Sequence, residues 1–412
     1  MTGEGPATGG AAPLKRRALA ALAASALTLL GVELAVGRFY PVLGQVYRLD
    51  PSLLHDTIPG SRRIQPMEPR RLREGDVARV LVEIDGGGFR GRGPLGDGKR
   101  VLVLGDSFVM AENVPLESTF VQQLANGLGE RLGQELIGIN AGRSGYGPDQ
   151  SLLLLERVMG DVAPDLVVCV LCAHNDLGDL ARNKLFRLDA AGGLERCSPR
   201  IGARLTDEFA RRGERSSALG IRRLVEFWRE APSRRPVDRV PAGTIDLYLA
   251  ALTAQFDEFF VRGDLEVVSL FEDVYDADGA IRPRSVPVAT KAALMTEVLR
   301  AMVELAGEQD VPIHFVVVPS AVDVDPGFGI RVDPARFPAY SPEALGRLLV
   351  RAVDEAGGVV SDLTQRLREE GTRAWVGGTD IHWNAVGQRI GAGQVAAELA
   401  SRPEVTNSLG GG

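Results

Sequence analysis

The stretch RVLVLGDSFVMAENV, from Arg100 to Val114, opens with apolar residues typical of a buried strand and turns polar at Gly105-Asp106-Ser107. A short apolar run that ends at a glycine is typical of a strand covered on both faces in a parallel sheet. A serine directly after such a strand can bind phosphate, form a turn or act as a nucleophile. Which of these roles applies depends on the polar segments that follow the other strands.

From Arg100 onward the sequence alternates between strand-like and helix-like segments, which is typical of a parallel sheet covered by helices. The predicted strands lie at 100–104, 135–140, 165–171, 313–319 and 358–363. The predicted helices lie near 118–132, 149–159, 290–309, 342–356 and 384–400. Between about 180 and 290 the alternation breaks, with a predicted hairpin around 190–193 and helical spacing at 214–230 and 244–260. We interpret this part as an insertion that forms a lid or a substrate wall.

The composition is that of a globular protein with a sizeable core. The chain has 412 residues, of which 45% are hydrophobic and 25% charged. The formal net charge is −7, and Lys and Arg occur only in short clusters. Because binding to a phosphate backbone needs a stripe of positive charge, nucleic acid is not expected as a partner.

The chain has three cysteines, Cys169, Cys172 and Cys197. Such a small and odd number cannot form a disulfide framework. The first two lie in the apolar run LVVCVLC, where strand alternation directs them to opposite faces, so we interpret them as buried packing residues. No clustered ligands predict a metal site, and the turn after the first strand lacks the glycines and lysine of a phosphate-binding loop. No cofactor is therefore expected.

The N-terminus has the pattern of a membrane anchor. A basic cluster at 15–17 precedes an apolar segment at 18–37, and a helix of about 20 residues spans one bilayer core. Glu33 is close enough to the far end to reach the interface. Positive charge before the span predicts a cytoplasmic N-terminus, so everything after Arg38 would lie in the periplasm, anchored to the inner membrane by a single pass. A cleaved signal peptide, with a small-residue site at 35–37, is the alternative.

Four polar segments are predicted to meet at one edge of the sheet. Ser107 follows the first strand, NAGRSGYG (140–147) the second and CAHND (172–176) the third. The segment GGTDIHWNAVGQ (377–388) lies just before the final helix. Because the working site of an open parallel sheet lies at the carboxyl ends of its strands, these segments are the candidate active site.

Gly105-Asp106-Ser107, Gly145, Asn175, and Asp380 with His382 occur in the order of the four sequence blocks of the SGNH (GDSL) hydrolase superfamily. The chain resembles that family over nearly all of its length after Arg100. The resemblance implies a three-layer α/β/α, flavodoxin-like domain with a five-stranded parallel sheet. It also implies ester chemistry through an acyl-serine intermediate, without a cofactor or a metal.

The resemblance assigns a role to each of these residues. Ser107 would be the nucleophile, His382 the general base, and Asp380 the carboxylate that orients the imidazole. The oxyanion would be held by the backbone N–H groups of Ser107 and Gly145 and by the side-chain amide of Asn175. The family more often has D-x-x-H where this chain has D-x-H, which leaves open which carboxylate orients the ring.

The remaining histidines have structural interpretations. His314 lies in a predicted core strand and His55 in the segment before the first strand. His174 occupies a position where the family often has glycine, and we interpret it as structural, with contact to substrate as the alternative. Trp383 and Asn384 are interpreted as a packing residue and a helix cap.

The resemblance and the anchor together predict a serine esterase that deacylates an O-acylated carbohydrate or another ester outside the cytoplasm. The segment TDIHWN (379–384) is also similar to the D-x-H-W element of polysaccharide O-acetyltransferases, so transfer of the acyl group to an envelope or exported polysaccharide is the first alternative. A non-catalytic carbohydrate-binding or scaffold protein is the second. No oligomeric state is predicted.

The predicted domain organisation has five parts. They are a cytoplasmic tail at 1–17, a transmembrane helix or signal anchor at 18–37, a stalk and lead-in hairpin at 38–99, the catalytic domain at 100–402 with its insertion at about 180–290, and a disordered tail at 403–412.

Overall fold

A five-stranded parallel sheet forms the centre of the molecule. The computed structural model describes residues 11–39, 44–66, 79–93, 96–217, 219–222, 224–225 and 243–410. The strands lie in the spatial order β13 (Val360–Asp362), β12 (Ile313–Val318), β7 (Leu166–Cys172), β5 (Lys99–Leu104) and β6 (Leu136–Asn140). Counted along the chain this order is 5-4-3-1-2, the flavodoxin-like arrangement. The predicted α/β fold with a five-stranded parallel sheet is therefore confirmed.

The central strands are apolar because helices cover both of their faces. All seven residues of β7 are buried, as are Val101 to Leu104 of β5. Cys169 and Cys172 are both free thiols within β7, so their interpretation as buried packing residues is confirmed. Parallel strands of this kind have no solvent-facing side, which explains the absence of polar alternation in LVVCVLC.

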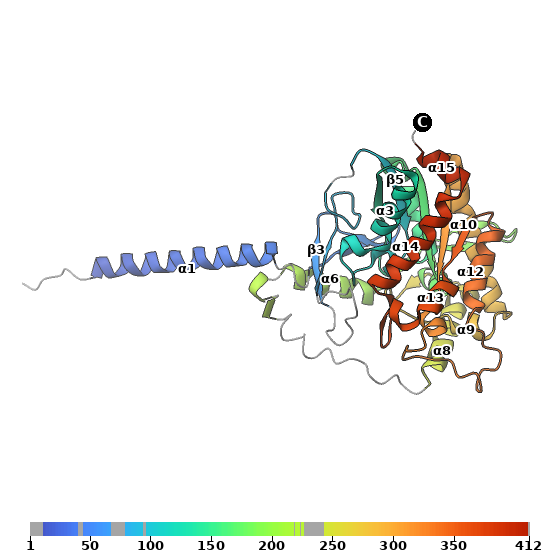
Figure 1. Ribbon diagram of the computed structural model, residues 1–412. Coiled ribbons are helices and arrows are strands. Elements are labelled where there is room, and N and C mark those ends of the chain that lie inside the picture. The colour runs from blue at the N-terminus through green and yellow to red at the C-terminus, as the bar shows by residue number, and fades with distance from the viewer. Residues whose placement is uncertain are drawn as a thin grey trace, which may run out of the picture.

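Helices cover the sheet in two layers (Figure 1). On one side α3 (Phe120–Leu132) packs along α14 (Ala385–Ala400), and on the other side lie α4 (Pro148–Val162), α10 (Val286–Glu308) and α12 (Ala344–Glu355). The buried residues of α3 recur at helical spacing and form a single apolar stripe: Phe120, Val121, Leu124 and Leu128. The helix ends at Gly133, whose left-handed backbone (φ +70°) closes the last turn.

The segment before the first sheet strand packs on the domain. The hairpins β1 (Tyr47–Asp50) with β2 (Leu54–Thr57) and β3 (Arg62–Pro66) with β4 (Arg79–Glu83) are antiparallel. The lead-in hairpin is thus observed, but the described part of 38–99 is not a free stalk. Leu53, Leu54 and His55 are completely buried. Gln150 of α4 donates to the Leu53 carbonyl, and the Tyr146 hydroxyl from the loop after β6 donates to the His55 carbonyl, so this segment lies against both. Residues 40–43, 67–78 and 94–95 lie outside the described residues.

The predicted insertion lies between α5 (Asp176–Asn183) and α10. The hairpin expected around 190–193 is confirmed as β8 (Phe186–Leu188) paired with β9 (Leu194–Arg196). The helix expected at 214–230 is helical at 214–217, 220–222 and 224–225, and its remaining residues 218, 223 and 226–230 lie outside the described residues. The helix expected at 244–260 is observed. The other elements of the insertion are β10 (Arg200–Ile201), α6 (Ala203–Ser217), α8 (Thr244–Phe256), η3 (Asp257–Val261), β11 (Glu266–Val267) and α9 (Ala277–Ile281).

Short elements complete the domain near the edge where the strands end. They are α2 (Ser107–Met110), η2 (Leu116–Ser118), α11 (Ala321–Val324), α13 (Thr364–Glu370), η4 (Gly371–Ala374), and the hairpin of β14 (Trp375–Gly377) with β15 (Asp380–Trp383).

The C-terminal segment is ordered, contrary to the prediction of a disordered tail at 403–412. It forms helix α15 (Pro403–Leu409), in which Val405 and Leu409 are buried one turn apart. Ser408 Oγ donates a hydrogen bond to the carbonyl of Asp165 (2.6 Å). The segment consists mostly of small and polar residues, but its two apolar residues are at helical spacing. Their burial holds α15 on the domain.

Helix α1 (Ala11–Phe39) projects away from the rest of the molecule (Figure 1). Within it, the stretch Arg16–Val36 has a mean hydropathy of 2.0, so it is long and apolar enough to cross a membrane. None of its most apolar part is buried against the rest of the molecule. The predicted span at 18–37 lies within this helix.

The packing of α15 can be tested with Val405→Asp. This change buries a carboxylate without a partner, so the free energy of unfolding should fall by about 3 kcal/mol, measured by chemical denaturation. Glu404→Gln, at an exposed position of the same helix, should change it by less than about 0.5 kcal/mol. Equal stability of the two variants would contradict the packing of α15.

Candidate active site

Ser107 is presented at the carboxyl end of β5 by a sharp turn. Gly105 has a φ of +149°, and a Cβ there would lie 2.6 Å from Val109 Cγ2 and 3.0 Å from the Val170 carbonyl oxygen, so only glycine fits. The Asp106 carboxylate accepts a hydrogen bond from Phe108 N (2.8 Å) and caps α2, which begins at Ser107. Because β5 lies between β6 and β7, this turn is at the point where the strand order reverses, the usual place for a ligand.

The Ser107 hydroxyl, His382 and Asp380 form one hydrogen-bonded chain. The distance from Ser107 Oγ to His382 Nε2 is 2.7 Å, and that from His382 Nδ1 to Asp380 Oδ1 is also 2.7 Å. A carboxylate can only accept, so the hydrogen of the neutral ring lies on Nδ1, and Nε2 is free to accept the serine proton. The structure thus brings together three residues that the sequence singled out.

The short D-x-H spacing is explained by a strand. Asp380 and His382 both lie on β15, where residues two apart point to the same face. The same Asp380 oxygen also accepts the backbone N–H of His382 (3.1 Å), which fixes the carboxylate beside the ring. Asp380 is therefore the carboxylate that contacts His382, the point that the sequence left open.

Buried contacts hold β15 against the segment that follows Ser107. Trp383 is fully buried, and its Nε1 donates to the Phe108 carbonyl (3.0 Å), while Asn113 Nδ2 donates to the Trp383 carbonyl (2.7 Å). The Asn384 side chain accepts from Val386 N (2.9 Å) and caps α14. Trp383 and Asn384 are thus a packing residue and a helix cap, as predicted.

The electrostatic setting of His382 favours the imidazolium. Burial opposes the charged ring, but the adjacent Asp380 carboxylate outweighs it and, with Asp273 and Asp106, raises the pKa of His382 to about 9. A charge that develops on the ring during proton transfer is therefore well stabilised. The cost is that the neutral, proton-accepting form becomes dominant only at alkaline pH.

The loop after β6 brings Gly145 beside the same turn. The Arg143 N–H donates to the Gly105 carbonyl (3.0 Å), which joins this loop to the end of β5. Gly145 has a φ of +78°, and a Cβ there would lie 2.9 Å from the Phe271 ring. Among the described residues, no acceptor faces the backbone N–H of Ser107 or of Gly145. Both groups are thus available to a ligand, as the predicted oxyanion pocket requires.

Asn175 is held by two residues that the sequence analysis missed. Its side-chain Nδ2 donates to Asp179 Oδ2 (2.5 Å), and Asp179 Oδ1 accepts from Arg182 Nε (2.9 Å). All three side chains are buried. Because Asp179 can only accept, the amide must face it with its nitrogen, which leaves one N–H to point elsewhere. The sequence contains a pattern that could have indicated these contacts, because Asn175, Asp179 and Arg182 are spaced so that they share one face of α5 and the turn before it.

Burial raises the pKa of Asp179 to about 6, although the Arg182 guanidinium opposes that rise. The carboxylate is therefore mostly ionised at neutral pH and continues to accept the hydrogen bond from the Asn175 amide. Arg182 Nη1 also donates to Gln255 on α8 (3.2 Å), so the insertion contacts this group of residues.

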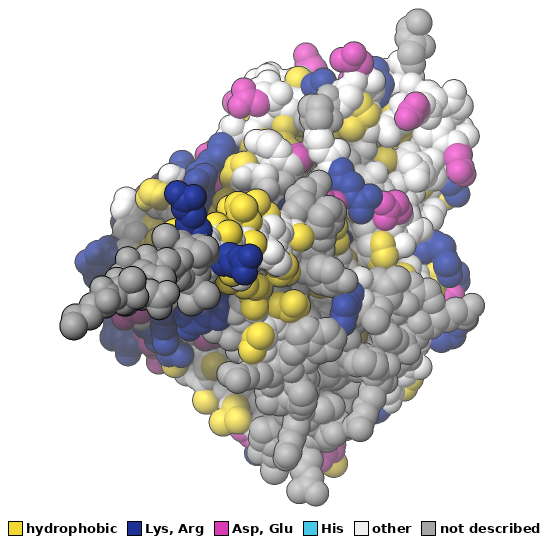
Figure 2. Space-filling view, turned by 90° about the vertical axis from the view of Figure 1, so that its left-hand side faces the viewer, with side chains coloured by type: hydrophobic (Ala, Val, Ile, Leu, Met, Phe, Trp, Pro, Cys, Tyr) yellow, Lys and Arg dark blue, Asp and Glu magenta, His cyan; other side chains and the backbone are white. Residues whose placement is uncertain are grey.

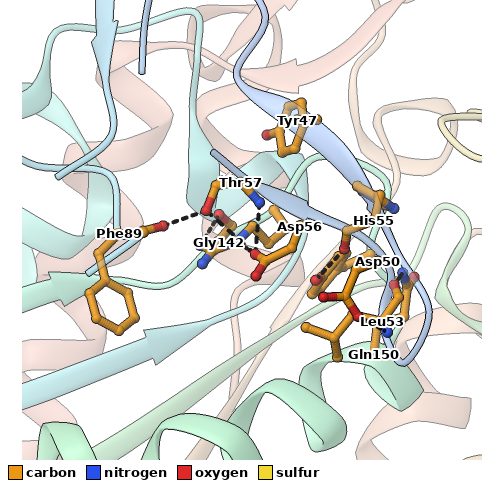
Figure 3. A network of polar contacts seen from close by, with 12 residues as sticks. Tyr47, Asp50, Leu53, His55, Asp56, Thr57, Phe89, Gly142 and Gln150 are labelled. Carbon is orange, nitrogen blue, oxygen red and sulfur yellow. Dashed lines mark hydrogen bonds and ion pairs between the residues drawn. The ribbon is translucent and has the colours of Figure 1, made fainter. Parts of the chain in front are cut away.

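The lead-in hairpin supports the loop that carries Gly145 (Figure 3). The backbone N–H of Ser144 donates to the Tyr47 hydroxyl (3.0 Å), and its carbonyl lies 2.9 Å from His55 Nε2. Arg143 Nε donates to Asp56 (2.9 Å). Burial lowers the pKa of His55 to about 4, so the ring is a neutral donor to the Ser144 carbonyl. Sequence analysis placed His55 in the lead-in but missed this contact, which joins residues 89 positions apart.

Phe271 of the insertion completes the wall beside Gly145. Its ring centroid lies 4.7 Å from that of His55 and 5.7 Å from that of Tyr47. Phe271 has a φ of +70°, a strained value for a residue with a bulky side chain. No sequence pattern singled it out, because its importance comes from three distant segments that meet there.

The other two histidines lie in the core. His174 is fully buried, with Nδ1 2.8 Å from Ser320 Oγ, and burial lowers its pKa to about 3. His314 is buried in β12, with Nε2 2.7 Å from Ser361 Oγ. Both positions agree with a structural role. Within the described parts of the chain, no group of three or more His, Cys, Asp or Glu side chains could hold a metal ion.

Comparison with known proteins finds similarity in solved structures. No family model matches the sequence, and no curated protein matches it. An alpha/beta hydrolase from the metagenome of Lake Arreo is 12% identical, with 76% of this chain and 97% of that chain covered and a TM-score of 0.35. A lipase/acylhydrolase from Enterococcus faecalis is 13% identical, with 74% and 96% covered and a TM-score of 0.35.

An acetyl xylan esterase from Geobacillus stearothermophilus is 12% identical, with 77% of this chain and 96% of that chain covered and a TM-score of 0.33. TM-scores of this size do not assign an activity, so the chemistry has to come from the geometry of the site.

The raised pKa of His382 predicts a pH profile. Proton acceptance needs the neutral ring, so kcat/KM for an ester should rise with pH to a midpoint near 9 and fall as pH drops below it. Asp380→Asn should lower turnover by about a thousandfold. It should also move the midpoint to lower pH, because burial then acts on the ring without its main opposing charge.

Asp273→Asn is the matched control, because it removes a carboxylate that contributes less to the pKa of His382. It should move the midpoint in the same direction by a smaller amount. Near-normal turnover and an unchanged midpoint in Asp380→Asn, with wild-type melting temperature, would end the assignment of Asp380.

Proposed function

We propose that this protein is a serine esterase of the SGNH type. The observation that carries the proposal is the hydrogen-bonded chain from Ser107 through His382 to Asp380, placed beside the free N–H groups of Ser107 and Gly145. A nucleophile, a base, an orienting carboxylate and donors for an oxyanion are the components that acyl transfer needs. A non-catalytic scaffold has no need of all four.

The reaction follows from this geometry. Ser107 Oγ attacks the ester carbonyl carbon while His382 Nε2 takes the hydroxyl proton, and the Asp380 carboxylate stabilises the imidazolium. The N–H groups of Ser107 and Gly145 and the amide of Asn175 hold the oxyanion, and one such donor contributes about 3 kcal/mol in the transition state. The intermediate expels the alcohol, which receives the proton from His382. Water then repeats the sequence on the acyl-serine and releases the acid.

An O-acylated carbohydrate outside the cytoplasm is the substrate that we propose. The Asp380 carboxylate contacts His382 and, with smaller contributions from Asp273 and Asp106, makes this side of the site favourable to positive charge. A neutral sugar ester meets no repulsion there, whereas a phosphate-bearing acyl donor does. Helix α1, with Arg16 and Arg17 at the start of its apolar stretch, supports a domain anchored on the outer side of a membrane.

Transfer to a sugar hydroxyl uses the same acyl-serine and differs only in the acceptor. The similarity of TDIHWN to polysaccharide O-acetyltransferases is the reason to test it. The tryptophan of that segment, Trp383, is buried and donates to Phe108, so its presence is explained by packing. We therefore place hydrolysis first.

The nucleophile can be tested with Ser107→Ala. Hydrolysis of p-nitrophenyl acetate should fall by about a thousandfold or more, and labelling by a fluorophosphonate should disappear, because both need the Ser107 hydroxyl. Ser401→Ala, an exposed serine after α14, should behave as wild type. Labelling of Ser107→Ala at the wild-type level would identify another nucleophile. The same assay with added xylose, scored for acetylated sugar, measures how the acyl group divides between water and a sugar hydroxyl.

The role of Asp179 can be tested by a double-mutant cycle. Asp179→Asn should lower kcat by about tenfold or more with little change in KM, because the Asn175 amide loses its fixed orientation. In an Asn175→Ala background the same change should have almost no further effect on kcat, since the amide is already absent.

Asp165→Asn, which removes an ion pair with Lys99 at the opposite edge of the sheet, is the control for that cycle. Its effect on kcat should be small and the same in both backgrounds. Equal effects of Asp179→Asn in both backgrounds would show that Asp179 acts on stability alone.

A further inference from the structure

A segment of the insertion, residues 219–225, lies against the outer end of α1. The Glu33 carboxylate accepts the backbone N–H of Gly220 and that of Ile221, the latter at 3.2 Å. A Cβ on Gly220 would lie 3.1 Å from Val36 Cγ1, so the two segments are in close contact. The described residues of this segment are 219–222 and 224–225.

This contact defines the depth of the segment relative to the apolar span. Glu33 is three residues before Val36, where the apolar part of α1 ends. At a rise of about 1.5 Å per residue, the contact lies about 5 Å inside that end. If α1 spans a bilayer, this level is the boundary between acyl chains and headgroups.

The side chains of the segment suit that boundary. Leu219 is 67% exposed, Val225 45% and Ile221 36%, although soluble surfaces seldom expose several large aliphatic side chains together. Figure 2 shows the face from which α1 projects, where hydrophobic side chains lie among Lys and Arg side chains.

We propose that residues 219–222 and 224–225 lie in the outer interfacial layer of the lipid bilayer, beside α1, as a second membrane contact. The proposal rests on the membrane anchor under the proposed function, and it explains Glu33. A carboxylate near the end of a span is costly in lipid, and here backbone N–H donors satisfy it. The bilayer is the favoured occupant because the segment that carries these exposed aliphatic side chains contacts the apolar span of α1 at Glu33 and Val36.

The membrane contact is structurally continuous with the active site. The segment follows α6, whose Phe209 stacks on Phe271 at 6.1 Å, and the Arg212 guanidinium lies 5.1 Å from the centre of the Phe271 ring. Phe271 in turn packs against Gly145. Docking of this segment on lipid would therefore be connected, through α6 and Phe271, to the wall beside Gly145.

The test uses the full chain reconstituted in phosphatidylcholine vesicles. Leu219→Cys and Ile221→Cys, each labelled with the fluorophore NBD, are compared with Leu247→Cys, which is 60% exposed on α8. All carry Cys197→Ser, since the other two cysteines are buried. Lipids with a spin label near the headgroup should quench NBD at 219 and 221 about threefold more than at 247, with emission shifted to the blue.

The outcomes separate the two proposals. A chain that floats with the vesicles but shows equal quenching at the three positions would overturn the second contact and leave the anchor standing. A chain that does not float would overturn both, while hydrolysis of p-nitrophenyl acetate reports on the esterase independently. A blue shift at 219 that depends on protein concentration and not on spin-labelled lipid would identify a second copy of the chain as the occupant and overturn the lipid proposal.

Discussion

The 2.7 Å hydrogen bond between Ser107 Oγ and His382 Nε2 joins two residues 275 positions apart. Closing so long a loop costs conformational entropy that a single hydrogen bond cannot offset. The geometry is maintained by the buried contacts around it. Trp383 donates to the Phe108 carbonyl, and the Gln388 side chain accepts the Phe120 N–H at 2.5 Å, so α14 and β15 are held on the helices that follow Ser107.

Three segments far apart in the chain converge on the other half of the site. The lead-in hairpin supplies Tyr47 and His55, the loop after β6 supplies Ser144 and Gly145, and the insertion supplies Phe271. A backbone N–H can hold an oxyanion only if the loop that carries it does not relax as charge develops. These contacts from both sides supply that rigidity, and through them the described part of the segment between α1 and β5 becomes part of the domain that carries the site.

Several buried carboxyl groups lie near the site. Asp106, Asp176 and Asp179 are buried near the nucleophile, and Arg182 is the buried cation that contacts Asp179. Burial raises the pKa of each of these three carboxyl groups. Because raised pKa values make these three groups easier to protonate, the charge that favours the imidazolium of His382 comes first from Asp380, with smaller contributions from Asp273 and Asp106.

The sequence by itself determined the features that depend on short-range patterns. Apolar runs and helical spacing predicted the five strands and the helices that cover them. The order of Ser107, Gly145, Asn175 and His382 predicted where the site lies, because parallel strands end at one edge. The apolar stretch before Arg38 predicted the long projecting helix.

Only the tertiary structure decided the features that depend on contacts between distant segments. The support of Ser144 by His55 and the position of Phe271 beside Gly145 leave no local pattern, since each side chain alone could be an ordinary core residue. The packing of α15 could not be predicted from the sequence, because two apolar residues among polar ones are too few to form a clear helical pattern. The partner of His382 was open until the structure showed that Asp380 and His382 lie on one strand, β15, because a spacing of two puts side chains on the same face only in a strand.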